Sequence, residues 1–252
     1  MRALLIRIMA ALMMFAALPQ ASAQALNVQL EQQASQQYRE LLDQARAKGA
    51  LAPDSNADLQ RLRRIQQRIL PFTYAVNPRA KQWSWEVNLV GSQQINAFCM
   101  PGGKIAFYTG IVTKLKLSDD EIAIVMGHEI THALKEHCVE QAKNQVYGDL
   151  AARAGGALLS AWLGIDPTIT DLGARAAHSL FQLRFSRGDE GEADAVGLEL
   201  AARAGYDPRA GVVLWQKMAQ AANGAPPQWL SSHPADTNRV AEIQKRLPTV
   251  LP

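Results

Sequence analysis

The stretch His128-Glu129-Ile130-Thr131-His132 constrains this chain more than any other part of the sequence. Residues four apart on an α-helix share a face, so on a helix both imidazoles point the same way. That is the spacing at which one Zn²⁺ ion takes two nitrogen ligands, with Glu129 beside them and not bound to the metal. The alternative is a helix whose two histidines bind nothing, but the motif is specific in a helical context. The sequence therefore predicts a zinc site built on a helix.

The helix is predicted by signals of its own. Ser118 and Glu121 have the spacing of a capping box, and the two carboxylates between them suit the positive end of the helix dipole. His137 lies nine residues beyond His128, which is about 180° round a continuous helix. We therefore do not expect His137 to be a ligand of the same metal.

A catalytic zinc site takes three protein ligands and keeps one position open, so a third ligand must come from elsewhere. Glu190 and Asp194 are four residues apart and share a helix face. We predict that Glu190 binds the metal and that Asp194 accepts the second ring N–H of a ligating histidine. Glu192 is about 200° round the helix from Glu190 and is expected to point elsewhere. The alternative is a solvated acidic helix start. The presence of His128 and His132 in the same chain favours metal binding by Glu190.

These residue types together indicate metal-assisted hydrolysis. Zinc polarises a carbonyl group and lowers the pKa of its bound water, and Glu129 can take the proton of that zinc-bound water as general base. We expect one Zn²⁺ per chain.

β structure is indicated only in the middle of the chain, where residues 83–90 alternate and are rich in strand formers. Strands are predicted over 83–90, 95–100 and 104–109, the last two joined by a glycine-rich turn. Helices are predicted over 27–48 and from 53 to about 70. The expected fold is α+β and mostly helical, with the small sheet packed on the metal-binding helix. A strand beside the site can pair with an extended peptide by strand addition.

The first 23 residues have the pattern of a secretory signal peptide. Arg2 and Arg7 form a positive start, residues 8–18 are apolar, and Ala21-Ser22-Ala23 supplies a small-residue cleavage site. The apolar run is short for a membrane span, although an uncleaved anchor is the alternative. We expect a mature chain from Gln24, without a transmembrane helix, in the bacterial periplasm or outside the cell.

Beyond the leader, residues 24–75 are predicted to form an N-terminal helical segment and residues 76–252 the metal-binding domain, packed together as one unit. The mature chain has 24 basic and 23 acidic residues, so charge gives no case for nucleic-acid binding. Cys99 and Cys138 are the two cysteines. In an oxidising compartment they can form a disulfide, or they can pack as buried thiols, and the sequence leaves both open.

The motif around Glu190 and Asp194 follows Ser186-Arg187. Together with the His128 motif, it resembles the gluzincin zinc metallopeptidases of the HtpX and CAAX prenyl protease family. Further matching motifs in the family's order are Asn96-Ala97-Phe98, Pro101-Gly102-Gly103, Thr109-Gly110, Ala204-Gly205-Tyr206-Asp207-Pro208, and Ser232-His233-Pro234 with Arg239. The resemblance covers about residues 95 to 240 and is closest to soluble periplasmic members that help maintain outer-membrane proteins. By it, Glu190 matches the third zinc ligand and Asp194 the acid behind the ligands.

The resemblance implies a zincin-like fold and a zinc-dependent endopeptidase that hydrolyses misfolded or stalled cell-envelope proteins in periplasmic quality control. A peripheral contact with the outer membrane or its assembly machinery is compatible with it. The sequence lacks the transmembrane helices of membrane members and stops at Pro252 without the helical repeats of others, so we do not expect repeat-mediated docking.

Two other functions stay open on the sequence. One is a non-hydrolytic zinc-containing chaperone or assembly factor for outer-membrane proteins. The other is a zinc hydrolase that acts on a small molecule or a cell-wall peptide. Glu129 favours a hydrolase over the chaperone, because zinc binding alone needs no general base.

His233 is the last candidate site residue. Pro234 disfavours helical geometry at His233, so an extended loop is expected to present the imidazole, and an ordinary turn histidine is the simplest reading of the residues alone. The resemblance implies that this histidine can reach the active site, so we count it with Glu129 as catalytic. Two roles are open: a fourth zinc ligand that displaces the water and gates the enzyme, which we favour, or a donor to the oxyanion.

Overall fold

The computed structural model describes residues 27–141, 184–222, 227–234 and 238–250; the predicted signal peptide, 1–23, lies outside them. The described elements are a helix over 27–47, α2 (Ala57–Val76), the 3-10 helix η1 (Pro78–Gln82), β1 (Glu86–Val90), β2 (Ala97–Met100), β3 (Lys104–Tyr108), α3 (Thr109–Lys114), α4 (Asp119–Leu134), a helical stretch that begins at 137, α6 (Arg187–Arg203), α7 (Ala210–Ala221), α8 (Trp229–Ser232) and α9 (Arg239–Val250). The predicted α+β, mostly helical class is confirmed. Among the described residues, no helix combines the length and the apolar character that crossing a bilayer requires.

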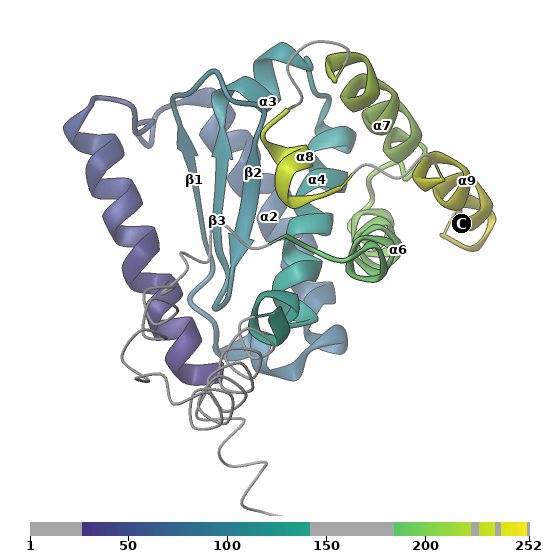
Figure 1. The fold of residues 1–252 in the computed structure, drawn as a ribbon, viewed down its shortest axis with the longest axis horizontal. Helices are drawn as coiled ribbons and strands as arrows, with labels where there is room; N and C mark the ends of the chain where they lie inside the picture. The colour runs from purple at the N-terminus through teal and green to yellow at the C-terminus, as the bar shows by residue number, and fades with distance from the viewer. Residues whose placement is uncertain (1–26, 142–183, 223–226, 235–237, 251–252) are drawn as a thin grey trace, which may run out of the picture.

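The three strands form one small sheet in the order β1-β3-β2. β1 runs parallel to β3 and β2 runs antiparallel to it, as the predicted glycine-rich turn requires. In Figure 1, β2 is the strand nearest to α4 and α8, so the edge of the described sheet faces the predicted metal helix.

The sheet lies between two helical layers, and each strand sends alternate side chains to opposite sides. Ile105 and Phe107 pack with α2 and α4 in the larger core, whereas Ala106 packs with the helix over 27–47 in a smaller one. On that second side the hydroxyl of Tyr38 donates to the carbonyl of Ile105. The N-terminal helices therefore cover both faces of the sheet.

The second helix differs from the prediction that it ends near residue 70, because α2 continues through Pro71 to Val76. Proline removes one N–H donor but does not end a helix that is held by burial on either side of it. Ile69 and Thr73 are both fully buried, and the Thr73 hydroxyl donates to the Leu70 carbonyl at 2.7 Å.

The two helices that carry the predicted ligands, α4 and α6, cross at a pair of glycines. A Cβ atom added to Gly127 would lie 2.5 Å from the carbonyl oxygen of Gly197, and one added to Gly197 would lie 2.6 Å from the backbone nitrogen of His128. Both contacts are with backbone, which cannot rotate aside. The absence of two side chains therefore sets the distance between the helices.

This crossing predicts that Gly197→Ala separates α4 from α6 and destabilises the fold by about 2 kcal/mol or more, as overpacking does. Gly191→Ala is the matched control on the same helix, because a Cβ there meets nothing within 4 Å. The control should stabilise the protein by roughly 0.5–1 kcal/mol through helix propensity. Urea unfolding with a chelator present measures both, and equal stability of the two variants would contradict the crossing.

Candidate metal centre

Four buried side chains from three segments converge on one point. His128 and His132 come from α4, Glu190 from the first turn of α6, and His233 from the residue that follows α8. One ligand atom from each lies within 4.8 Å of all the others. The structure therefore brings together the three predicted ligands and His233.

The local sequence explains how the two helices present these residues. Both halves of the predicted capping box at Ser118 form at the start of α4. A second capping box at Ser186 and Asp189 starts α6, which the sequence analysis did not identify. It fixes the first turn of α6, where Glu190 lies.

The donor set fits zinc in chemistry and in spacing. Ligand atoms about 2.0–2.1 Å from one tetrahedral zinc lie about 3.3 Å apart. Nε2 of His128 lies 3.1 Å from Nε2 of His132 and 3.3 Å from Nδ1 of His233. Oε1 of Glu190 lies 3.5 Å from Nε2 of His132 and 3.0 Å from Nδ1 of His233. Three imidazoles and one carboxylate at these distances are a zinc-type ligand set.

Burial also favours the neutral imidazoles that a metal requires. It lowers the pKa of His128 and, more strongly, that of His132. For His233, burial and then the charge of Arg239 lower the pKa to about 3. All three rings are therefore neutral at neutral pH and offer lone pairs to a cation.

Asp194 lies behind His128, on the side away from the cluster. Its Oδ1 is 3.0 Å from Nδ1 of His128, while Nε2 of His128 faces the other ligand atoms. Burial acts to raise the pKa of Asp194, but the hydrogen bond with His128 and the charge of Arg239 outweigh it and lower that pKa. The carboxylate is thus ionised and can hold a proton on Nδ1 of His128.

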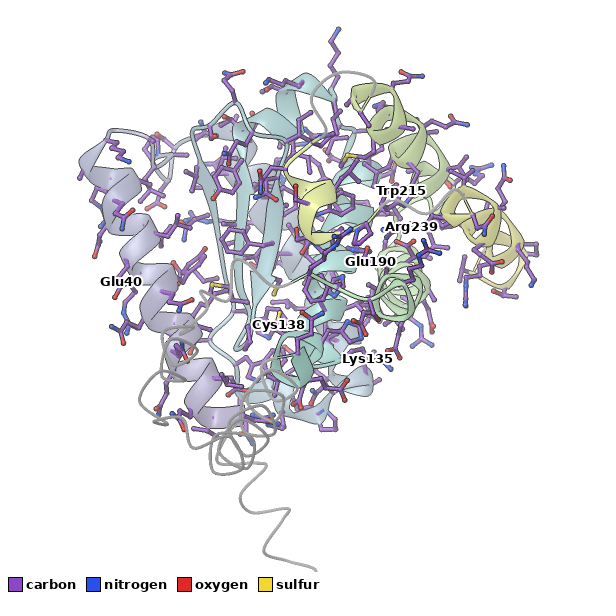
Figure 2. All side chains as sticks on the ribbon, in the orientation of Figure 1. Glu40, Lys135, Cys138, Glu190, Trp215 and Arg239 are labelled. Atoms are coloured by element: carbon purple, nitrogen blue, oxygen red, sulfur yellow. The ribbon has the colours of Figure 1, made fainter. Side chains whose placement is uncertain are left out.

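Arg239 on α9 joins both acidic residues, a role that the sequence analysis did not assign. Its guanidinium donates to Glu190 and forms two hydrogen bonds with Asp194, at 2.6 and 2.7 Å. The same group lies 3.7 Å above the ring of Trp215. Figure 2 shows Trp215, Arg239 and Glu190 one below another beside α6. No local pattern could have shown this contact, because Arg239 is 45 residues from Asp194.

Glu129, the predicted general base, is not among the four clustered residues. Its Oε1 accepts a hydrogen bond of 2.6 Å from Nε1 of Trp229 and lies 3.5 Å from Nε2 of His233. Burial raises the pKa of Glu129 well above its usual value. α8 and the residue after it therefore contact both the predicted base and the ligand cluster.

His137 does not lie where the sequence analysis expected. α4 ends at Leu134, and Glu136 has a left-handed φ of 57°. The chain thus turns back, and Nδ1 of His137 lies 3.0 Å from Nδ1 of His132. The expected position about 180° round the helix is wrong because it assumed a continuous helix, but His137 is outside the four-residue ligand cluster, as expected. Glu192 is outside the ligand cluster, but its Oε2 contacts Nε2 of His137 at 3.2 Å.

A cavity of about 310 Å³ extends from the cluster along β2. Its lining includes Glu129 and His233, apolar side chains such as Leu41 and Phe98, and polar side chains such as Asn96 and Gln228. Cys99 and Cys138 also line it as buried free thiols. The cavity thus places both apolar and polar side chains beside Glu129 and the edge strand.

A His-Glu-His helix, completed by a glutamate from a second helix and flanked by a small sheet, defines the gluzincin class of metallopeptidase folds. Residues 59–247 match the family model of peptidase family M48. The chain belongs to this family.

Several related proteins have names that describe proteases. The mitochondrial metalloendopeptidase OMA1 of Bos taurus is 33% identical over 190 residues, which are 69% of this chain and 34% of the relative. OMA1 of Arabidopsis thaliana is 36% identical over 162 residues, covering 62% and 30%. A putative beta-barrel assembly-enhancing protease of Vibrio cholerae is 31% identical over 163 residues, covering 63% and 34%. The chain thus matches about a third of the length of these relatives.

Proposed function

We propose that the chain is a zinc-dependent endopeptidase in which His128, His132 and Glu190 hold one Zn²⁺ and Glu129 acts as general base. The observation that carries the proposal is the position of a buried glutamate beside a buried set of four ligand-type atoms, at the end of a cavity. A purely structural zinc site is closed by four ligands and needs no carboxylate poised beside it.

Bound zinc supplies a Lewis acid that polarises the scissile carbonyl and makes water acidic enough to ionise near neutral pH. Glu129 accepts the proton of the attacking water and delivers it to the leaving amine. The burial that raises the pKa of Glu129 suits this double role, because a base must also be able to release its proton. Asp194 and Arg239 hold His128 and Glu190 in place.

The substrate is proposed to be an extended protein segment. β2 lies at the edge of the described sheet and lines the cavity, so a main chain can align with it by strand addition. Folded proteins rarely offer such a segment, whereas unfolded ones do. The apolar part of the lining, which includes Leu41, Phe98 and Phe185, suits hydrophobic side chains, which misfolded proteins expose.

We place this activity in the bacterial cell envelope. The N-terminal leader pattern favours export to the periplasm. Two bacterial relatives are named for enhancing β-barrel assembly, which supports misfolded or stalled envelope proteins as substrates and a peripheral link to the outer membrane. A zinc-containing chaperone is the less favoured alternative, since it gives no role to Glu129.

We propose further that His233 gates the site. Its Nδ1 lies 3.0 Å from Glu190, at the spacing of a fourth metal ligand. The indole N–H of Trp229, in the same segment, donates a hydrogen bond to Glu129. Backbone hydrogen bonds tie α8 to Ile95 and Phe185 at its two ends. With α8 in this position, His233 would take the fourth ligand position that the catalytic water needs, so catalysis requires α8 to move.

The central prediction for the mechanism concerns Glu129→Gln, which removes the base but keeps the size of the side chain. Casein hydrolysis should fall by at least about 100-fold, as for loss of a general base, while bound zinc stays near one per chain. Glu199→Gln on the exposed side of α6 is the control and should be fully active. Hydrolysis by the Glu129→Gln variant at the normal rate would refute the proposed mechanism.

His233→Ala separates the two roles of this histidine by sign. A gate predicts faster casein hydrolysis or self-cleavage, because the water site opens. A donor to the oxyanion predicts slower hydrolysis. The matched control is Ser231→Ala, an exposed change in the same short helix. A slower rate would contradict the gate, and an unchanged rate with unchanged zinc affinity would return His233 to an ordinary turn residue.

A further inference from the structure

Each ring nitrogen of His132 has a different partner. Nε2 faces the cluster, 3.1 Å from Nε2 of His128 and 3.5 Å from Glu190. Nδ1 faces the opposite way and lies 3.0 Å from Nδ1 of His137. The other nitrogen of His137, Nε2, lies 3.2 Å from the carboxylate of Glu192. The three side chains form a line, His132-His137-Glu192, which leads from the cluster to the surface.

Along this line, the nitrogen that carries the proton in one ring determines which nitrogen carries it in the next. A nitrogen that binds a metal carries no proton, so neutral His132 must carry its proton on Nδ1. Nδ1 of His137 must then accept it, which leaves the single proton of neutral His137 on Nε2. That proton points at Glu192, whose carboxylate can only accept. The reverse order would put a proton on the nitrogen of His132 that faces the cluster.

The two histidines of α4 therefore have different hydrogen-bond partners behind the cluster. His128 has the carboxylate of Asp194, and His132 has an imidazole backed by a carboxylate. Hydrogen bonds behind ligating histidines fix their tautomer and ring orientation. The ring of Phe185 lies 3.8 Å from that of His132 and shields it from water. Among the described residues, His137 is the hydrogen-bond partner of Nδ1 of His132.

The chain uses a strained turn to bring His137 to this position. Glu136 adopts a positive φ, which a residue with a side chain rarely does. Its carboxylate is held by Arg79 and by the side-chain amide of Asn27, at 2.9 Å for the amide. The amide of Asn77 also donates to the carbonyl of Leu134 at 2.8 Å, where α4 ends. These contacts tie the turn to the N-terminal helices.

We propose that His137 is a positioning residue for the metal site, which sets the tautomer and orientation of His132 and is itself oriented by Glu192. The inference rests on the proposed zinc site and adds a residue that does not touch the metal. Its competitor is a buried histidine that only stabilises the fold.

Zinc affinity, measured by competition with a chelator, tests the inference together with urea unfolding of the metal-free protein. His137→Leu should lower zinc affinity about 10- to 100-fold, the usual loss for an outer hydrogen bond to a ligand. His137→Asn places a carbonyl oxygen near the position of Nδ1, so it should recover most of that affinity. Glu192→Ala should cause a smaller loss.

Lys135→Met is the matched control, because Lys135 pairs with the other oxygen of Glu192, at 2.7 Å, and touches no imidazole of the line. Its zinc affinity should equal that of the wild type, since a partly exposed ion pair contributes little. Nitrogen NMR of the zinc-loaded wild type should show His132 protonated on Nδ1.

Equal affinity losses in His137→Leu and His137→Asn would overturn the inference, as would unchanged zinc affinity in both. A loss of unfolding free energy without a loss of zinc affinity would assign His137 to the fold alone. Failure of the wild type to bind zinc would instead refute the metal site itself, so the two proposals fail in different ways.

Discussion

The close crossing of α4 and α6 brings the ligands of the proposed zinc site within reach of one another. Gly127 and Gly197 meet backbone to backbone, and a Cβ on either would lie within 2.6 Å of the other helix. Glu190 on α6 can reach His128 and His132 only because this distance is short. The tight fit also explains why α4 is buried along almost its whole length.

The same crossing brings together buried carboxylates whose negative charge a cation can neutralise. Glu129, Glu190 and Asp194 are three carboxylates in a largely buried space, and Arg239 is the cation that contacts two of them. Burial raises the pKa of both glutamates, which means that water no longer compensates their charge. A divalent ion among three neutral imidazoles would restore the balance. α8 closes the same space from the side of β2, with Trp229 on Glu129 and His233 on Glu190.

Local patterns in the sequence predicted the local parts of this arrangement. The capping box at Ser118, the spacing of His128 and His132, and the three strands depend on neighbours along the chain, and each was found in the structure. Contacts of Arg239 and Trp229 with the site join residues 45 and 100 positions apart, so no local pattern encodes them. His137 was misplaced because one left-handed residue, Glu136, ended the helical geometry on which the expectation rested.

The central claim is that one zinc ion binds where His128, His132 and Glu190 meet. The most direct measurement is a crystal structure of the purified protein with anomalous diffraction data collected on both sides of the zinc absorption edge, combined with the metal content in solution. We expect one zinc per chain and one anomalous peak within coordination distance of these three side chains. A protein without zinc after metal loading, or a peak bound at another set of residues, would contradict it.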